Sequence, residues 1–105
     1  SVIGLKLERY AVYAATKAAV EVMTGILAKE MRGKQITVNA VAPGPTETEL
    51  FLQDKSEEMV TKLANMSPME RLGQPSDIAS VVAFLASEQS AWVNGQTIRA
   101  NGGVV

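Results

Sequence analysis

Tyr13 and Lys17 are the residues of this sequence whose types and spacing could do chemistry. They are four positions apart in a segment with helical periodicity, so their side chains would lie one turn apart on one helix face. A phenol has a reference pKa of about 10, and a neighbouring ammonium favours the phenolate and lowers that pKa. The pair could therefore act as an acid and base near neutral pH. Spacing alone also fits an ordinary exposed pair on a helix surface.

The composition excludes several other kinds of site. Histidine and cysteine are both absent from the 105 residues, which rules out disulfides, thiol chemistry, histidine-dependent triads and His/Cys zinc sites. Carboxylate pairs such as Glu47 and Glu49 are too exposed in context to argue for a metal, and we predict no metal site. With 10 basic and 11 acidic residues, the chain has no polycationic stripe to attract nucleic acid or an anionic membrane.

The hydropathy pattern predicts a cytoplasmic protein with no membrane partner. No apolar run approaches the roughly 20 residues of a membrane span. The N-terminus lacks the succession of charged, apolar and small residues that marks a signal peptide. With 47% apolar and 20% charged residues, the composition is that of one small globular unit.

The elements that must position the Tyr–Lys pair alternate between helices and strands. Apolar periodicity without proline predicts a long helix over residues 10–34, with Gly33 as its C-terminal cap. The β-branched run over residues 36–42 stops at Pro43, as expected for a parallel strand covered on both faces. Ligands bind at the carboxyl ends of such strands, so residues 43–48 form the expected ligand-binding loop. Beyond this loop, the pattern predicts helices over residues 57–65, with Ser56 as N-cap, and 75–87, opened by Pro75, and a final strand over residues 96–100.

Longer strings place the pair in a family context. They are Tyr13-Ala-Ala-Thr-Lys17, Asn39-Ala-Val-Ala-Pro-Gly-Pro-Thr-Glu-Thr48, Arg71-Leu-Gly-Gln-Pro-Ser-Asp77, Val93-Asn-Gly-Gln96 and Asn101-Gly-Gly103. In this order they resemble the short-chain dehydrogenase/reductase (SDR) family, in particular the tetrameric subgroup that includes β-ketoacyl-(acyl-carrier-protein) reductases. The resemblance implies an α/β fold, a Rossmann-like doubly wound parallel sheet in three α/β/α layers. It also implies an NAD(P)-dependent oxidoreductase that interconverts a ketone and a secondary alcohol by hydride transfer.

The resemblance also implies roles for single residues. Tyr13 would be the general acid that protonates the carbonyl oxygen, or the base in the reverse oxidation, and Lys17 would lower its pKa and hydrogen-bond the nicotinamide ribose. The backbone at Pro43-Gly44 would turn beside the nicotinamide. The main chain of Thr46 would meet the carboxamide, and Thr48 would support the carboxamide or the pyrophosphate. Their residue types alone fit loop hydroxyls that close a local turn just as well.

Three further residues each allow two interpretations. Ser1 is the candidate for the family serine that hydrogen-bonds the substrate carbonyl, but that serine usually stands one position farther from the tyrosine. A serine before residue 1 is therefore the alternative. Asn39, polar within a strand, is interpreted as structural rather than as part of the site. Trp92 is interpreted as an interface or core anchor rather than a substrate contact.

The Gly-rich turn and ribose-reading residue that hold the adenosine half of a dinucleotide are missing from these residues. We therefore interpret residues 1–105 as the C-terminal portion of one SDR domain, with the amino-terminal dinucleotide-binding half absent. We expect it to leave a sheet edge and helix faces uncovered and to be unstable as a free monomer. The cofactor is NADP or NAD, and family habit favours NADP.

The resemblance further implies a small-molecule carbonyl or alcohol substrate and a homo-oligomer, either a tetramer or a dimer. The alternative function is a catalytically inactive SDR fragment that acts only in subunit association.

Overall fold

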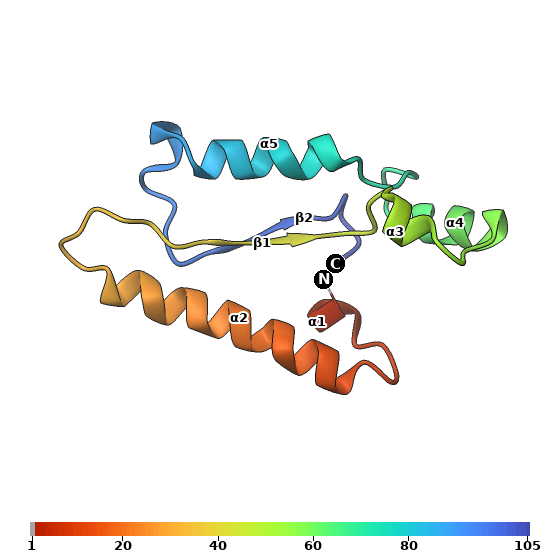
Figure 1. The fold of residues 1–105 in the computed structure, drawn as a ribbon, viewed down its shortest axis with the longest axis horizontal. Coiled ribbons are helices and arrows are strands. Elements are labelled where there is room, and N and C mark those ends of the chain that lie inside the picture. Colours follow the sequence, from red (N-terminus) through yellow and green to blue (C-terminus); the bar gives the residue numbers. More distant parts are fainter. Residues whose placement is uncertain (1) are drawn as a thin grey trace.

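The computed structural model describes residues 2–105, so the role predicted for Ser1 lies outside the described residues. The two strands form a parallel sheet with helix α2 on one side and helix α5 on the other, and α3 and α4 project beyond the carboxyl end of β1 (Figure 1). This layering agrees with the predicted α/β/α arrangement. The elements in chain order are α1 (Val2–Leu5), α2 (Ala11–Glu30), β1 (Ala40–Pro43), α3 (Glu49–Leu52), α4 (Glu57–Ala64), α5 (Pro75–Leu85), the 3-10 turn η1 (Glu88–Ser90) and β2 (Thr97–Ala100).

Helix α2 ends earlier than its periodicity predicts. The expected helix covers residues 10–34, whereas the observed one ends at Glu30. Turns follow, in which the Met31 amide donates to the Leu27 carbonyl at 3.0 Å. Gly33 has a φ of +79°, the left-handed region in which a glycine is least strained. It is therefore a turn glycine beyond the helix rather than the residue that caps it.

Strand β1 is shorter than the apolar run that predicts it and is shifted toward the proline. The expected strand covers residues 36–42, whereas β1 begins at Ala40. The segment before Ala40 faces a turn, where the Val38 amide donates to Asn94 Oδ1 at 2.8 Å. At Val38 the Asn94 side chain thus accepts the amide hydrogen bond that a backbone carbonyl of a paired strand would otherwise accept. Regular pairing starts only where Ala40 lies opposite Thr97.

The two strands stay paired up to the carboxyl end of the sheet. Pro43 lies opposite Ala100, and the Gly44 amide donates to the Ala100 carbonyl at 3.0 Å. The ladder therefore continues past the proline into the loop that follows. Within residues 2–105 the other edge of β1 has no paired strand.

Asn39 joins the two strands where they begin. Its Nδ2 donates to the Val93 carbonyl at 2.8 Å, and its Oδ1 accepts from the Gln96 amide at 3.0 Å. These contacts are those that its structural interpretation requires. We expect Asn39→Leu to lower the free energy of unfolding of the full protein by about 1–3 kcal/mol, because two backbone groups lose their partners. Urea unfolding measures this, with Asn65→Ala at the exposed C-cap of α4 as control; equal midpoints for both variants would contradict it.

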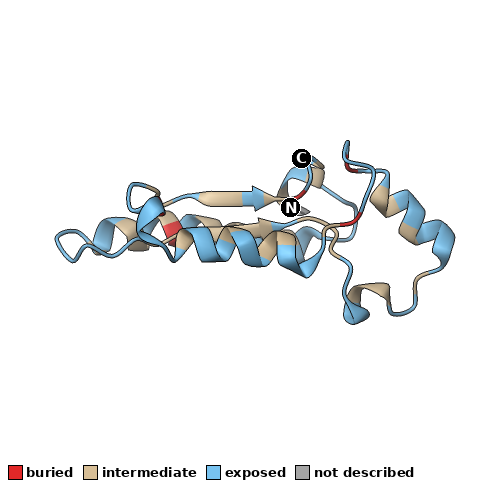
Figure 2. Ribbon diagram, turned by 90° about the horizontal axis from the view of Figure 1, so that it is seen from above, coloured by how far each residue is buried: buried red, intermediate tan, exposed pale blue. Residues whose placement is uncertain are grey.

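The described chain is open rather than closed over a core. Leu72 is the one buried apolar residue of this region, and most surfaces in Figure 2 are exposed or partly exposed. The accessible surface is 7742 Å², whereas a compact monomer of this mass exposes about 5,700 Å². The radius of gyration is 15.4 Å against about 13 Å for a compact chain of this length. Trp92 is 99% exposed, so its interpretation as a core anchor is wrong within residues 2–105.

Helix α2 also has the length and composition of a membrane span. It has 20 residues, and its most apolar window has a mean hydropathy of 1.3, so the expectation that no apolar run reaches this length is wrong. Lys17 and Glu21 interrupt its middle. An apolar helix that packs inside a larger fold has the same length and composition.

Candidate active site

Tyr13 and Lys17 lie together on one face of α2, as their spacing predicts. Lys17 Nζ is 5.3 Å from the centroid of the Tyr13 ring, within the range of a cation–π contact. Both side chains are exposed, and Tyr13 retains 49% of its accessible surface. The phenol is thus held next to a cation and is still open to a ligand.

A second tyrosine also contacts the Tyr13 ring. Tyr10 meets it edge to face, with centroids 5.8 Å apart and an interplanar angle of 83°. This is a favourable arrangement for two aromatic rings. Tyr10, the N-cap residue of α2, and Lys17, one turn after Tyr13, therefore both restrict the position of the Tyr13 ring.

The pair opens onto a cavity of about 400 Å³ between α2 and the sheet. Pro43 and Gly44 line the same cavity, so the structure brings together four of the residues predicted for the site. Glu21, one turn beyond Lys17, is a further charged group on its wall that the sequence interpretation missed. Its position four residues after Lys17 is the signal that could have indicated it. The remaining lining residues are Val20, Ala40, Val41, Ala42 and Thr97.

Gly44 marks the closest approach of the loop to the end of β2. A Cβ placed on Gly44 would lie 2.7 Å from Asn101 Cα and 3.0 Å from the Asn101 carbonyl oxygen. Asn101 is itself buried and bonded, because its Nδ2 donates to the Val105 carbonyl and its Oδ1 accepts from the Gly103 amide. The wall of the cavity at this point is therefore backbone packed on backbone.

The hydroxyls of Thr46 and Thr48 both have local partners. Thr46 Oγ1 donates to the Gly44 carbonyl at 2.9 Å, and Thr48 Oγ1 accepts from the Phe51 amide at 3.1 Å as the N-cap of α3. The local-turn interpretation accounts for these bonds. With Pro43, the two threonines line a separate open groove against α5 instead of the Tyr13 cavity.

The main chain of Thr46 is oriented by its neighbours. The Gly73 amide donates to the Pro45 carbonyl at 2.9 Å, and the Glu47 amide donates to the Gly73 carbonyl at 2.8 Å. In a parallel bridge of this kind Pro45 and Glu47 make the hydrogen bonds to Gly73, and the residue between them, Thr46, directs its own N–H and C=O away from Gly73. The backbone of Thr46 thus points away from Gly73.

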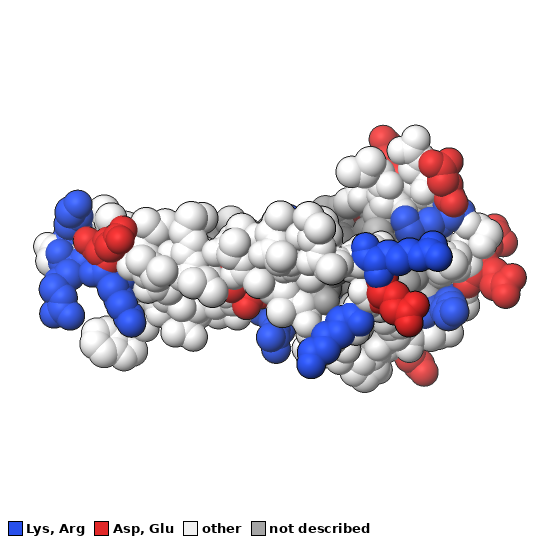
Figure 3. Space-filling model, turned by 90° about the horizontal axis from the view of Figure 1, so that it is seen from below, with Lys and Arg blue, Asp and Glu red and all other residues white. Residues whose placement is uncertain are grey.

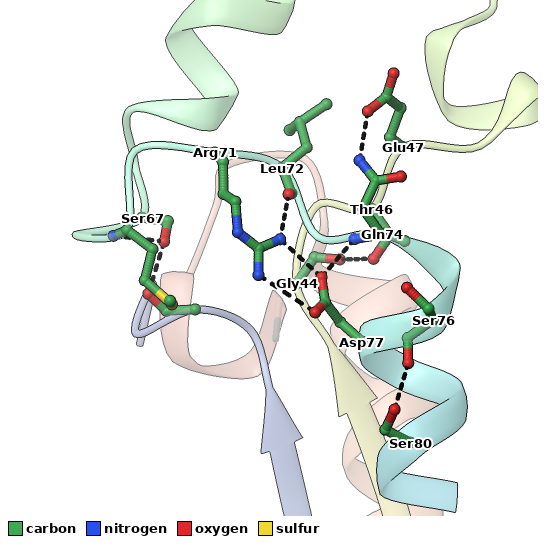
Figure 4. Close-up of polar contacts among 12 residues, drawn as sticks. Gly44, Thr46, Glu47, Ser67, Arg71, Leu72, Gln74, Ser76, Asp77 and Ser80 are labelled. Carbon is green, nitrogen blue, oxygen red and sulfur yellow. Dashed lines mark hydrogen bonds and ion pairs between the residues drawn. The ribbon is translucent and has the colours of Figure 1, made fainter.

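An ion pair lies at the N-terminus of α5, beside this loop. Arg71 donates to both carboxylate oxygens of Asp77, at 2.7 and 3.2 Å, and to the Leu72 carbonyl at 2.9 Å (Figure 4). Asp77 also accepts from the Gln74 amide at 2.7 Å. The hydrogen bond from Arg71, followed by that from Gln74, lowers the pKa of Asp77 from 3.8 to about 2.

The lowered pKa of Asp77 predicts a pH dependence of stability. Its carboxylate contributes stability that is fully present above its unfolded pKa near 4 and is lost as pH falls through about 2. We expect the difference in melting temperature between the protein and Asp77→Asn to shrink between pH 4 and pH 2. Thermal melts across this range test it, with Asp54→Asn as the control outside this network. A difference that stays constant down to pH 2 would show that the ion pair does not contribute.

The comparisons with known proteins agree with this fold. The family model described as "Enoyl-(Acyl carrier protein) reductase" matches residues 2–105. A "Short-chain type dehydrogenase/reductase" of Picea abies is 52% identical over 105 residues, which are 100% of this chain and 39% of that protein. The chain belongs to the short-chain dehydrogenase/reductase family.

Other SDR proteins extend this similarity to solved structures. An SDR of Brucella melitensis titled "Glucose/ribitol dehydrogenase" superimposes with a TM-score of 0.88 and 38% identity, over 99% of this chain and 42% of that one. The angucycline C-6 ketoreductase LanV with bound NADP gives a TM-score of 0.78 and 37% identity, over 88% of this chain and 35% of that one. An NADPH-dependent aldehyde reductase-like protein of Arabidopsis thaliana is 52% identical over 91% of this chain and 36% of its own length.

These matches confirm the fold class and explain the open packing. The chain spans 36 to 39% of the two plant relatives, and it superimposes almost entirely on part of a larger SDR domain. Its two-stranded sheet is therefore a partial Rossmann-like sheet. Helix α2 is a helix of that fold, which accounts for its apolar composition.

Proposed function

We propose that the protein is an NADP(H)-dependent SDR oxidoreductase that interconverts a small-molecule ketone and a secondary alcohol. The cavity lined by Tyr13, Lys17, Pro43 and Gly44 supports this proposal, because in it a tyrosine and a lysine lie against the loop that leaves a parallel strand. The names of the relatives support the cofactor, since they include an NADPH-dependent aldehyde reductase-like protein and a ketoreductase with bound NADP.

The residues of the cavity fit the nicotinamide end of such a cofactor. Lys17 supplies hydrogen-bond donors, Gly44 presents backbone without a side chain, and the apolar run of β1 supplies a flat wall. The cavity residues that would hold it are Lys17, Pro43 and Gly44. The main chain of Thr46, outside this cavity in the same loop, would meet the carboxamide, and Thr48 would support the loop as the N-cap of α3. When bound, the reduced nicotinamide supplies the hydride that reaches the carbonyl carbon.

The proton for the carbonyl oxygen comes from Tyr13 in this proposal. Its hydroxyl donates the proton as the oxygen gains charge, and the product is the secondary alcohol. Lys17 stabilises the phenolate that remains, because its ammonium lies next to the ring. In the oxidation direction the phenolate accepts the alcohol proton. Ser1, if it has the role predicted for it, orients the carbonyl.

A direct assay tests this function. The purified full protein is mixed with NADPH and a panel of small ketones and aldehydes, and NADPH consumption and alcohol formation are followed together. We expect equal amounts of NADPH consumed and alcohol formed, and weaker activity with NADH. A protein that neither binds NADPH nor reduces any carbonyl compound would contradict the proposal.

The second candidate function, subunit association without catalysis, is favoured by the exposed apolar side of α2. On the face seen in Figure 3 charged side chains gather toward the two ends and are sparse between them. A purely associating chain would bind no NADPH in the assay above and would be insensitive to substitution of Tyr13. Exposed apolar residues of α2 include Val12, Val22, Met23 and Ile26.

A further inference from the structure

The loop that forms the wall of the cavity is attached to the N-terminus of α5 by its backbone. The two hydrogen bonds of the Gly73 bridge fix Pro45 and Glu47, the residues on either side of Thr46. A Cβ at Gly73 would be 3.4 Å from Thr46 Oγ1, an ordinary van der Waals distance, so this segment and the loop are in direct contact. The position of the loop backbone therefore depends on the position of Gly73, in the segment before α5.

A hydrogen bond between two side chains adds to this backbone attachment. Gln74 Nε2 donates to Glu47 Oε2 at 2.6 Å, across 27 positions of the sequence (Figure 4). Gln74 is in turn held by Asp77 through its backbone amide, and Asp77 is held by Arg71. A continuous chain of polar contacts thus runs from the ion pair to the loop.

The contact lies where the chain leaves the loop for α3 and α4. Directly after Glu47 the chain continues into α3 and α4, which project beyond the sheet (Figure 1). A displacement of this projecting part would reach Thr46 and Gly44 through Glu47. The hydrogen bond between Glu47 and Gln74 opposes that displacement, because it connects the loop directly to the start of α5.

We propose that Glu47 and Gln74 are positioning residues, whose hydrogen bond holds the backbone of residues 44–47 in the conformation that receives the nicotinamide end of the cofactor. The inference rests on the proposed function. Neither side chain lines the Tyr13 cavity, so both act through the loop. Loss of the bond weakens cofactor binding and leaves proton transfer by Tyr13 intact.

The decisive variants are Glu47→Ala and Glu47→Gln in the full protein. Glu47→Ala removes the acceptor, and we expect the Kd for NADPH to rise about five- to tenfold with kcat at saturating NADPH changed less than twofold. Glu47→Gln keeps an oxygen that can accept from Gln74, so we expect most of the affinity to return. The double variant Glu47→Ala/Gln74→Ala should bind NADPH no more weakly than whichever single variant binds it more weakly.

Two controls separate positioning from stability. The Glu47 side chain is exposed, so Glu47→Ala should leave the melting temperature nearly unchanged. Ser80→Ala removes another exposed hydrogen bond, from Ser80 Oγ to the Ser76 carbonyl on α5, and should leave the Kd unchanged. Hydrogen exchange without cofactor gives a second readout. The backbone amide of residue 47 donates to the Gly73 carbonyl, and we expect it to exchange faster in Glu47→Ala than in the wild type.

The outcomes distinguish this inference from the function on which it rests. A wild-type protein that neither binds nor oxidises NADPH overturns the proposed function and the positioning role with it. An active wild type whose Glu47→Ala variant keeps the same Kd overturns the inference alone, whether or not the Glu47 amide exchanges faster. A variant that loses affinity only because it melts at a lower temperature overturns it as well.

Discussion

Tyr13→Phe is expected to lower kcat for carbonyl reduction by about 10² to 10⁴-fold while NADPH still binds. Phenylalanine keeps the ring that packs against Tyr10 and lies beside Lys17, and it removes only the hydroxyl that we propose as the proton donor. The measurement is kcat at saturating NADPH and ketone, with the Kd for NADPH determined separately. A nearly unchanged Kd assigns the loss to proton transfer.

Tyr10→Phe is the matched control for this result. It makes the same chemical change in the ring that contacts Tyr13, and the residue four positions later is Ala14 instead of a lysine. We expect its kcat to stay within about twofold of the wild type. Activity retained by Tyr13→Phe would remove Tyr13 as the acid, and equal losses in both variants would point to packing of the aromatic pair.

The order of elements could be predicted from the sequence, but their ends could not. Periodicity located α2 and α5, and the apolar run before Pro43 located β1. The strand nevertheless starts at Ala40 because an Asn94 side chain occupies the place of a ladder partner before it. That contact joins residues 56 positions apart, and no local pattern reports it.

The same distinction applies to the site. Tyr13 and Lys17 could be found because their contact is local, one turn apart on a helix. Glu47 and Gln74 could not, since their bond depends on where the loop and α5 meet in space. Thr46 and Thr48 are intermediate cases: their residue types allowed two interpretations, and the structure adds local partners for both hydroxyls.

Gly44→Ala is expected to have the largest structural effect of any single methyl added to the loop. The new Cβ would lie 2.7 Å from Asn101 Cα and 2.9 Å from Asn101 Cβ, closer than such atoms approach, and neither can swing away as the tip of a side chain would. We expect a loss of about 3 kcal/mol in the free energy of unfolding, from overpacking. Because Gly44 also lines the Tyr13 cavity, kcat/KM should fall with it.

Gly25→Ala tests whether the position, rather than the loss of a glycine, causes this effect. Gly25 lies inside α2, and within residues 2–105 a Cβ there meets nothing within 4 Å. Alanine is favoured over glycine in a helix interior by about 0.5–1 kcal/mol, so this variant should be as stable as the wild type or more stable. Urea unfolding of both variants gives the comparison. If Gly44→Ala unfolds at the wild-type midpoint, the end of β2 can move away from the loop, and the close backbone contact does not fix the wall of the cavity.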